Sequence, residues 1–215
     1  MTVNKSGKLI AVAAKIISTI FHPILIPSLG VFIILNAGNS YLTLLSYKSK
    51  LIILSVICSG TLIIPLLFLP VYYYMNIVST NDLRNRFERS FPLFITAIVY
   101  FSTFYFLRST TIPKIIISFI LASFVSVMIN FFMNLFWKIS SHMIGTGGIL
   151  ALIFILIFQY DNGLTGILLF SIIMSGMIAS ARLYLEAHTP AQIYTGFFLG
   201  FACVSLILIF SNRIL

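Results

Sequence analysis

The chain has 215 residues, of which 60% are hydrophobic and only 8% are charged. Water-soluble domains carry roughly 25% charged residues, because their surfaces face water. The composition therefore excludes a soluble globular domain and indicates an integral membrane protein. The 13 basic and 4 acidic residues give a net charge of +9. Such an excess fits basic side chains beside anionic lipid headgroups, or basic side chains in a pocket for an anionic substrate.

Apolar runs recur along almost the whole sequence and predict an all-α, polytopic bundle of six to seven transmembrane helices. Each crossing needs about 20 predominantly apolar residues. We expect a single integral membrane domain over residues 1–215, with N-terminal helices in residues 1–78 and a functional core in residues 79–205. The short basic start is followed by no small-residue cleavage site, so we expect a retained first helix.

The first apolar stretch, residues 9–35, contains two prolines four positions apart, Pro23 and Pro27. Proline lacks a backbone donor and crowds the preceding turn, so this stretch is expected to kink or break. His22 lies at that point, and we interpret it as satisfying a freed carbonyl or lying at the membrane interface. Residues 51–78 predict the next span, with a tyrosine cluster at its interfacial end.

The most polar segment of the chain, residues 79–92, precedes the remaining spans. Four of these spans are expected at residues 91–107, 115–136, 164–180 and 193–210. Another is expected to begin within residues 137–148 and to end at about residue 159. Asn130 and Asn134 lie one helical turn apart, and we expect their shared face to point into the bundle. Gly196 and Gly200 have the spacing of a small-residue packing face between helices.

Three polar segments fall on one side of the membrane in this arrangement. They are Arg84–Arg89, the surroundings of His142 and the stretch from Ala181 to Gln192, and two spans separate each from the next. The remaining basic residues are more numerous on the opposite side, so the positive-inside rule places the three segments outside. An N-terminal segment lying in the interface would reduce seven crossings to six without separating them.

Cations, histidines and hydroxyls dominate these segments. They are Arg84, Arg86, Arg89, Lys138, Arg182, His142, His188, Ser140 and Ser141. Guanidinium groups match phosphate oxygens bidentately, and amides at a glycine-rich helix start add donors. No Asp/Glu cluster in the sequence suits magnesium, so we expect no metal and no cofactor. Two histidines among cations indicate a covalent scheme, in which one imidazole attacks phosphorus and the other protonates the leaving oxygen.

The sequence resembles the type 2 phosphatidic acid phosphatase superfamily over roughly residues 80–205. Arg182-x5-His188 resembles the third motif of that superfamily, Ser-Arg-x5-His-x3-Asp. Ser140-Ser141-His142 resembles the second motif, Pro-Ser-Gly-His. Glu88-Arg89-x-x-Pro92 occupies the place of the first, Lys-x6-Arg-Pro. The flanking sequence is similar to that of a divergent bacterial branch of the superfamily.

The resemblance implies roles for individual residues. His188 would be the nucleophile and His142 the general acid. The phosphoryl oxygens would be bound by Arg182, Arg89, Ser140 and the backbone amide of Ser141.

The sequence also departs from the motifs. Ala181, Ile139 and Ser141 replace the serine, proline and glycine of the motifs. The first motif lacks its lysine, so Arg86 or Lys138 would supply that charge. Gln192 stands where the superfamily has an aspartate; its carbonyl can orient the imidazole but supplies no charge.

We therefore expect a metal-independent membrane phosphatase that hydrolyses a phosphomonoester or diphosphate on a lipid headgroup through a phospho-histidine. Phosphatidic acid, phosphatidylglycerol phosphate, undecaprenyl diphosphate and lipid A are candidate substrates. The alternative is a catalytically silent protein of the same fold that binds or moves an anionic lipid. We expect the membrane and a lipid phosphate as partners, no nucleic acid, and a bacterial inner membrane location with the site facing the periplasm; the oligomeric state stays open.

Overall fold

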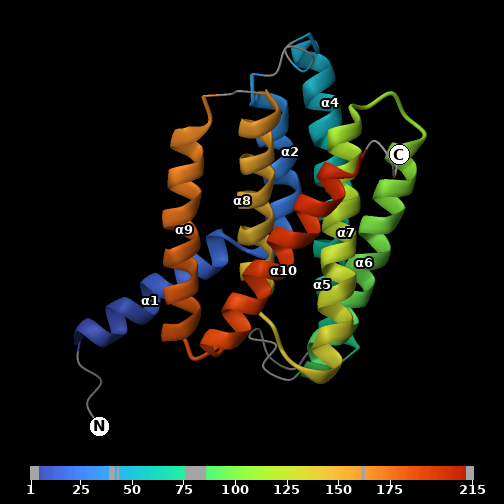
Figure 1. The fold of residues 1–215 in the computed structure, drawn as a ribbon. Coiled ribbons are helices and arrows are strands. Elements are labelled where there is room, and N and C mark those ends of the chain that lie inside the picture. Colours follow the sequence, from blue (N-terminus) through green and yellow to red (C-terminus); the bar gives the residue numbers. More distant parts are fainter. Residues whose placement is uncertain (1–4, 39–41, 43, 76–85, 161–162, 212–215) are drawn as a thin grey trace.

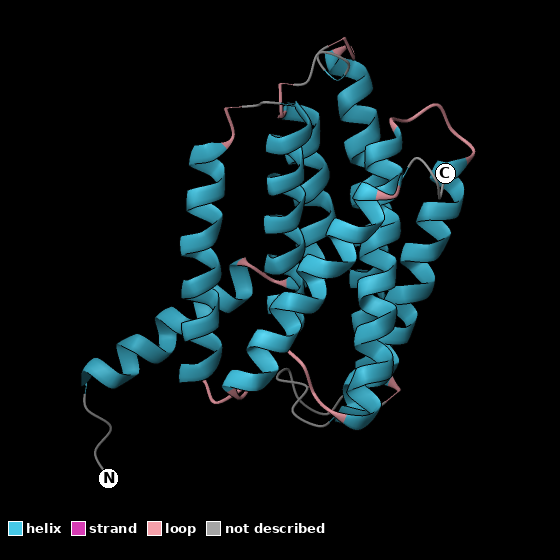
Figure 2. Ribbon diagram, in the orientation of Figure 1, coloured by secondary structure: helices cyan, strands magenta, loops and turns pink. Residues whose placement is uncertain are grey.

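The computed structural model describes residues 5–38, 42, 44–75, 86–160 and 163–211. Every regular element in these ranges is a helix, and the helices pack side by side into a bundle (Figures 1 and 2). Seven helical segments within these ranges are long and apolar enough to cross a membrane: Gly7–Asn36, Tyr47–Tyr74, Glu88–Arg108, Lys114–Phe136, Ser141–Gln159, Thr165–Tyr184 and Pro190–Ile209. The chain is therefore an all-α, polytopic integral membrane protein, as its composition predicts.

The first span is a broken helix. Helix α1 (Lys5–Ile20) is followed by a 3-10 turn, η1 (Pro23–Leu25), and by α2 (Ile26–Asn36). His22 is extended, with φ −63° and ψ 135°, as a residue before proline prefers. In Figure 1, α1 runs obliquely outward while α2 lies along the bundle. Because 11 helical residues rise only about 16 Å, α2 alone is too short for a span, and the predicted break is confirmed.

The second span is a continuous helical segment with a π-helical turn near its middle. It consists of α4 (Tyr47–Cys58), the π-helix η2 (Ser59–Ile63) and α5 (Ile64–Tyr74). It begins four residues before the predicted start, because Ser46 caps the helix by accepting from the Ser49 amide at 3.1 Å. The last predicted residues, 76–78, lie outside the described part of the chain. The tyrosine cluster divides: Tyr72 is buried against Phe91, whereas Tyr74 is exposed.

Five further helices complete the bundle. They are α6 (Arg86–Arg108), α7 (Lys114–Phe136), α8 (Ser141–Tyr160), α9 (Thr165–Tyr184) and α10 (Pro190–Ile209). Helix α8 is central, with 67% of its span buried inside the bundle against 17% for α9. Two predicted starts were too late. Helix α6 begins at Arg86, where Glu88 in the first turn complements the helix dipole. Helix α10 begins at Pro190 because Thr189 caps it.

Glycines allow α8 and α10 to approach closely. A Cβ atom on Gly200 would collide with the carbonyl of Ile144, and one on Gly147 with the carbonyl of Phe197. A Cβ on Gly196 would lie 2.7 Å from the carbonyl oxygen of Ser140. The predicted packing face of Gly196 and Gly200 is thus confirmed. This contact fixes the start of α10 against the residues that lead into α8.

The described parts of the three polar segments lie at one end of the molecule. In Figure 1 the end of α5, the start of α6, the α7–α8 connection and the α9–α10 connection all lie at the lower end. The turn between α6 and α7, the end of α8 and the start of α9 lie at the opposite end. The alternation of spans therefore brings the segments to a common side, as counting crossings predicted.

Replacing Gly200 by alanine should destabilise the bundle, because the added methyl group has no room between α10 and α8. Overpacking of this kind costs about 1–3 kcal/mol. Gly176 in α9 is the matched control, since a Cβ there would meet nothing within 4 Å. We expect Gly176→Ala to leave the thermal midpoint in detergent unchanged or raised, and Gly200→Ala to lower it. Equal midpoints for the two variants would contradict this packing.

Candidate functional site

Residues 137–140 connect α7 to α8, and α8 begins inside the bundle. Trp137 is extended, with φ −147° and ψ 127°. The amide of Ser140 donates to the carbonyl of Gln192 at 3.2 Å, and Ile139 and Ser140 are fully buried. Figure 1 shows α8 beginning deeper in the bundle than the neighbouring ends of α7 and α10. The first amides of α8, which lack partners within their own helix, therefore lie inside the molecule and suit an anion.

Ser141 is the point where three helices meet. Its hydroxyl oxygen accepts a hydrogen bond from Nη2 of Arg89 in α6 and another from Nδ2 of Asn130 in α7, the latter at 2.7 Å. A hydroxyl has two acceptor positions and one hydrogen. Both acceptor positions are taken, so the Ser141 hydrogen is available to donate to a ligand oxygen. The sequence placed the Asn130 face inside the bundle, which is confirmed, but it did not identify this contact.

Arg89 and Ser140 are buried polar residues beside this point. Arg89 is only 7% exposed, although it carries a positive charge. The Ser140 hydroxyl is buried with no hydrogen-bond partner among the described residues. A buried hydroxyl without a partner is unfavourable by about 1–3 kcal/mol. An oxygen of a bound anion would give the Ser140 hydroxyl the acceptor that it lacks.

A tight turn after α9 sets the spacing between Arg182 and His188. The Ala187 amide donates to the Arg182 carbonyl at 3.1 Å, and the Glu186 amide to the Leu183 carbonyl at 2.9 Å. These two bonds form a Schellman motif. Glu186 occupies its left-handed position, with φ 50°, which favours glycine. The side chain of Glu186 is exposed in this turn.

The orientation of the His188 ring follows from its contact with Gln192. Oε1 of Gln192 lies 3.1 Å from the Thr189 amide and 3.2 Å from Nδ1 of His188. A backbone N–H only donates, so the Gln192 atom facing it must be the carbonyl oxygen. That oxygen accepts in turn from Nδ1–H of His188. The neutral ring is therefore protonated at Nδ1, and Nε2 keeps its lone pair.

Three cations from different parts of the chain surround His188. Burial is the largest cause that lowers the pKa of His188 from 6.5 to about 3, followed by the charges of Arg89, Arg182 and Lys138. The hydrogen bond that His188 donates to Gln192 opposes this shift. The structure thus brings the predicted nucleophile together with three of the predicted phosphate-binding residues, and it keeps the imidazole neutral at neutral pH.

His142 contacts the N-terminal part of the chain. Its Nε2 lies 3.0 Å from the carbonyl oxygen of Ser18 in α1, and its ring meets that of His22 edge-on at 5.8 Å. A carbonyl only accepts, so Nε2 of His142 carries a hydrogen. The charges of Arg182 and Arg89 act on His142 as well as on His188. The two imidazoles share these neighbours, and no direct contact between them occurs among the contacts described.

Other predicted residues have mixed outcomes. The Nδ1 atom of His22 accepts from the Ile24 amide at 3.3 Å, so His22 satisfies an amide and not a freed carbonyl. The alternative, that His22 lies at the membrane interface, stays a prediction. Arg86 is the first residue of α6, with its side chain outside the described part, and Arg84 lies wholly outside it. Within the described residues, no group of three or more His, Cys, Asp or Glu side chains gathers as metal ligands would.

Comparisons with protein-family models, with curated proteins and with solved structures gave no match for this chain. The resemblance to the type 2 phosphatidic acid phosphatase superfamily therefore depends on the motif residues and their placement.

The titration of His188 should respond to an anion. Inorganic phosphate bound beside Arg89 and Arg182 would offset their charges and raise the pKa of His188 from about 3. NMR titration of the histidine rings, assigned with His188→Asn, measures this shift in detergent. Arg108→Gln, which removes a charge at the opposite end of the bundle, should leave the response unchanged, and Arg89→Gln should weaken it. A pKa that phosphate does not move would contradict an anion site here.

Stability should depend on the same titration. Between pH 6.5 and about 3 the unfolded chain binds a proton at residue 188 that the folded chain does not. The free energy of unfolding should therefore fall as the pH falls through this window. In His188→Asn this part of the decrease should be absent. Equal pH dependence of unfolding in the two proteins would show that His188 keeps an ordinary pKa.

Proposed function

We propose that this protein is an integral membrane phosphatase that removes a phosphomonoester or diphosphate group from a lipid. The observation that carries the proposal is the neutral, oriented imidazole of His188 among Arg89, Arg182 and Lys138. An imidazole with a free Nε2 lone pair is a nucleophile, and surrounding cations draw a phosphate group to it. The motif resemblance supports the same assignment.

Binding of the phosphate group would use the cations that act on His188 together with groups at the start of α8. The guanidinium groups of Arg89 and Arg182 would bind its oxygens in pairs, and Lys138 would add a point charge. The hydroxyls of Ser140 and Ser141 and the first amides of α8 would donate to the remaining oxygens. Because these donors are oriented before the substrate arrives, they stabilise developing charge with little rearrangement.

In the first chemical step, Nε2 of His188 would attack phosphorus as the bond from phosphorus to the leaving oxygen breaks. His142 would donate a proton to that oxygen. Water would then attack the phospho-histidine, His142 would take a proton from this water, and phosphate would leave. Gln192 would keep Nδ1–H of His188 in place throughout, as the third group of a catalytic triad does.

The hydrogen bond between His142 and Ser18 sets a condition on this scheme. With Nε2–H bound to the Ser18 carbonyl, His142 can donate from Nδ1 only in its imidazolium form. Donation from Nε2 would require this hydrogen bond to break. Proton delivery is therefore coupled to the position of α1.

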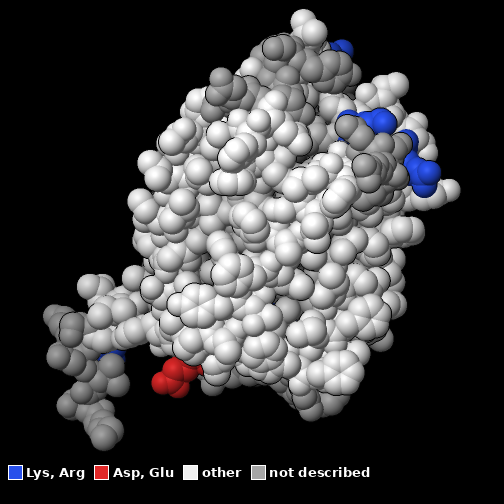
Figure 3. All heavy atoms as spheres, in the orientation of Figure 1, with Lys and Arg blue, Asp and Glu red and all other residues white. Residues whose placement is uncertain are grey.

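We propose a bacterial inner membrane location with the site facing the periplasm. Figure 3 shows most of its blue Lys and Arg atoms at the upper end of the molecule, opposite the site, and a smaller blue area at the lower left, over α1. Lys48, Lys50, Arg108 and Lys114 flank spans at that end. Basic residues beside spans favour the cytoplasmic side, which supports this orientation.

A silent lipid-binding protein is the second candidate. Gln192 brings no negative charge to His188, and His142 is bound to a backbone carbonyl. Either feature would slow catalysis without weakening the attraction of the cations for an anionic lipid. Such a protein would bind lipid phosphates through the same residues.

Phosphate release by the purified protein from a panel of lipid phosphates separates the two candidates. We expect release by the wild type, none above background for His188→Ala, and a kcat roughly 10²–10⁴-fold lower for His142→Ala. Arg108→Gln is the control for loss of a distant charge. No release from any lipid, or undiminished release by His188→Ala, would contradict the phosphatase and favour the silent lipid-binding protein.

The orienting role of Gln192 can be separated from its role in capping α10. Gln192→Leu removes the acceptor for Nδ1–H of His188, and we expect it to lower kcat. The decrease should be at most about 10⁴-fold, the loss that a wrong tautomer causes in a catalytic triad. Gln192→Glu keeps the acceptor and adds a charge, so it should raise the pKa of His188 and preserve activity. Thr189→Ala loses only the cap, about 0.5–2 kcal/mol of stability, and should keep kcat. Similar kcat values for wild type and Gln192→Leu would disprove an orienting role.

A further inference from the structure

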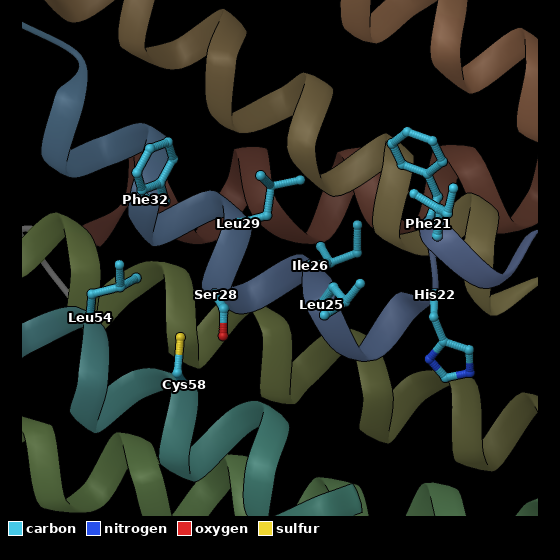
Figure 4. A pocket seen from close by; sticks show the side chains of 10 residues that line it. Phe21, His22, Leu25, Ile26, Ser28, Leu29, Phe32, Leu54 and Cys58 are labelled. Atoms are coloured by element: carbon cyan, nitrogen blue, oxygen red, sulfur yellow. The ribbon is translucent and has the colours of Figure 1, made fainter. Parts of the chain in front are cut away.

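An apolar groove lies between the first two spans. It has a volume of about 390 Å³, within the range of roughly 300–1,000 Å³ typical of small-molecule sites. Figure 4 shows Leu25, Ile26 and Leu29 in a row, with His22 at one end and Phe32 and Leu54 at the other. The N-terminal third of the chain, to which the motif resemblance assigns nothing, builds this groove.

The lining of the groove suits hydrocarbon. Ser28, one of its polar residues, has its hydroxyl 3.1 Å from that of Thr61, so the hydroxyl is satisfied within the protein. Leu29 is 40% exposed and Phe32 is 52% exposed on a membrane-spanning segment, so the groove opens toward lipid. An apolar concavity in this position excludes a polar ligand, because nothing in the bilayer core replaces the lost water.

One end of the groove lies beside His142 of the candidate site. His22 lines the groove, and its ring contacts that of His142 at 5.8 Å. His142 in turn feels the charges of Arg182 and Arg89. From His22 to Phe32 the chain advances ten residues, or about 15 Å of helix rise. If an anionic lipid headgroup were bound beside Arg89 and Arg182, the hydrocarbon chain attached to it would therefore lie at the His22 end of the groove.

We propose that this groove binds the hydrocarbon chain of the lipid whose phosphate group occupies the site. The inference rests on the proposed function and extends it: the groove would select long-chain lipid phosphates over short, water-soluble ones. The lipid would enter sideways from the bilayer between α2 and α4, with its phosphate passing His22. A neutral membrane lipid filling the groove without regard to the site is the competing outcome.

Photo-crosslinking tests occupancy independently of catalysis. The probe is a long-chain alkyl phosphate with a diazirine at the chain end, and its control is the alcohol with the same chain. We expect phosphate-dependent adducts on residues 20–32 and 54–58, and we expect them in His188→Ala as well. Adducts spread over lipid-facing helices such as α9, or equal labelling by the alcohol, would overturn the proposal.

Filling the groove tests selectivity. Leu29→Trp places an indole in the groove, and Leu51→Trp is matched to it, because Leu51 is 44% exposed on α4 but does not line the groove. We expect Leu29→Trp to lower kcat/KM for a long-chain alkyl phosphate at least about tenfold, equal to 1.4 kcal/mol or about two buried CH₂ groups. A short-chain phosphomonoester should be hydrolysed equally by both variants.

The outcomes of these experiments separate the groove from the phosphatase. Unchanged long-chain turnover in Leu29→Trp, with an active wild type, would overturn the groove and leave the phosphatase standing. Groove adducts in a wild type that releases no phosphate from any lipid would support the groove and overturn the phosphatase. Neither adducts nor phosphate release would overturn both.

Discussion

Close backbone contact between α8 and α10 is the constraint on which the site depends. Gly196 lies against the carbonyl of Ser140, and the amide of Ser140 donates to the carbonyl of Gln192. One contact thus ties the start of α8, with its serines, to the start of α10, with the group that orients His188. In lipid, where apolar surfaces gain little by meeting each other, such close packing and the hydrogen bonds it permits are the main source of helix association.

The electrostatics of the site follow from this packing. Buried positive charges repel one another and lose hydration, so a cluster of them is stable only with compensating groups or a bound anion. Arg89 of α6 is buried, whereas Arg182 of α9 and Lys138 of the α7–α8 connection are half-buried. Burial of His188 lowers its pKa most, and the charges of these three residues lower it further. The cations that help to keep the imidazole neutral would also stabilise a bound phosphate group. In the proposed phosphatase, affinity for the phosphate group and nucleophilicity of His188 would therefore share one physical origin.

Much of the fold could be predicted because it depends on local signals. Pro23 marks the break in the first span, and the apolar runs and turns between them give the spans and the common side of the polar segments. Element starts were less accurate, since Arg86 and Pro190 join helices through caps and dipoles that hydropathy ignores. The inward turn of Tyr72 depends on Phe91 of another helix, which no local pattern reveals.

The candidate site was predictable in its residue types and not in its connections. Arg182 and His188 stand close in sequence, so their association is visible in the motif spacing. The bond from Asn130 to Ser141 and the contact of His142 with Ser18 join different helices, and the second crosses 124 positions. Contacts of this kind are set by how helices pack. For that reason the sequence left the N-terminal third without a role, although it contacts the proposed acid.

The contact between Ser18 and His142 has a consequence for how the protein is made. Ser18 lies in the last turn of α1, where carbonyl groups have no partner in their own helix. Synthesis begins at the N-terminus, so this helix end enters the membrane long before α8 exists. The insertion of α8 then supplies the missing donor. The break in the first span is thus completed by a helix made later, and the same contact positions His142, the proposed proton donor.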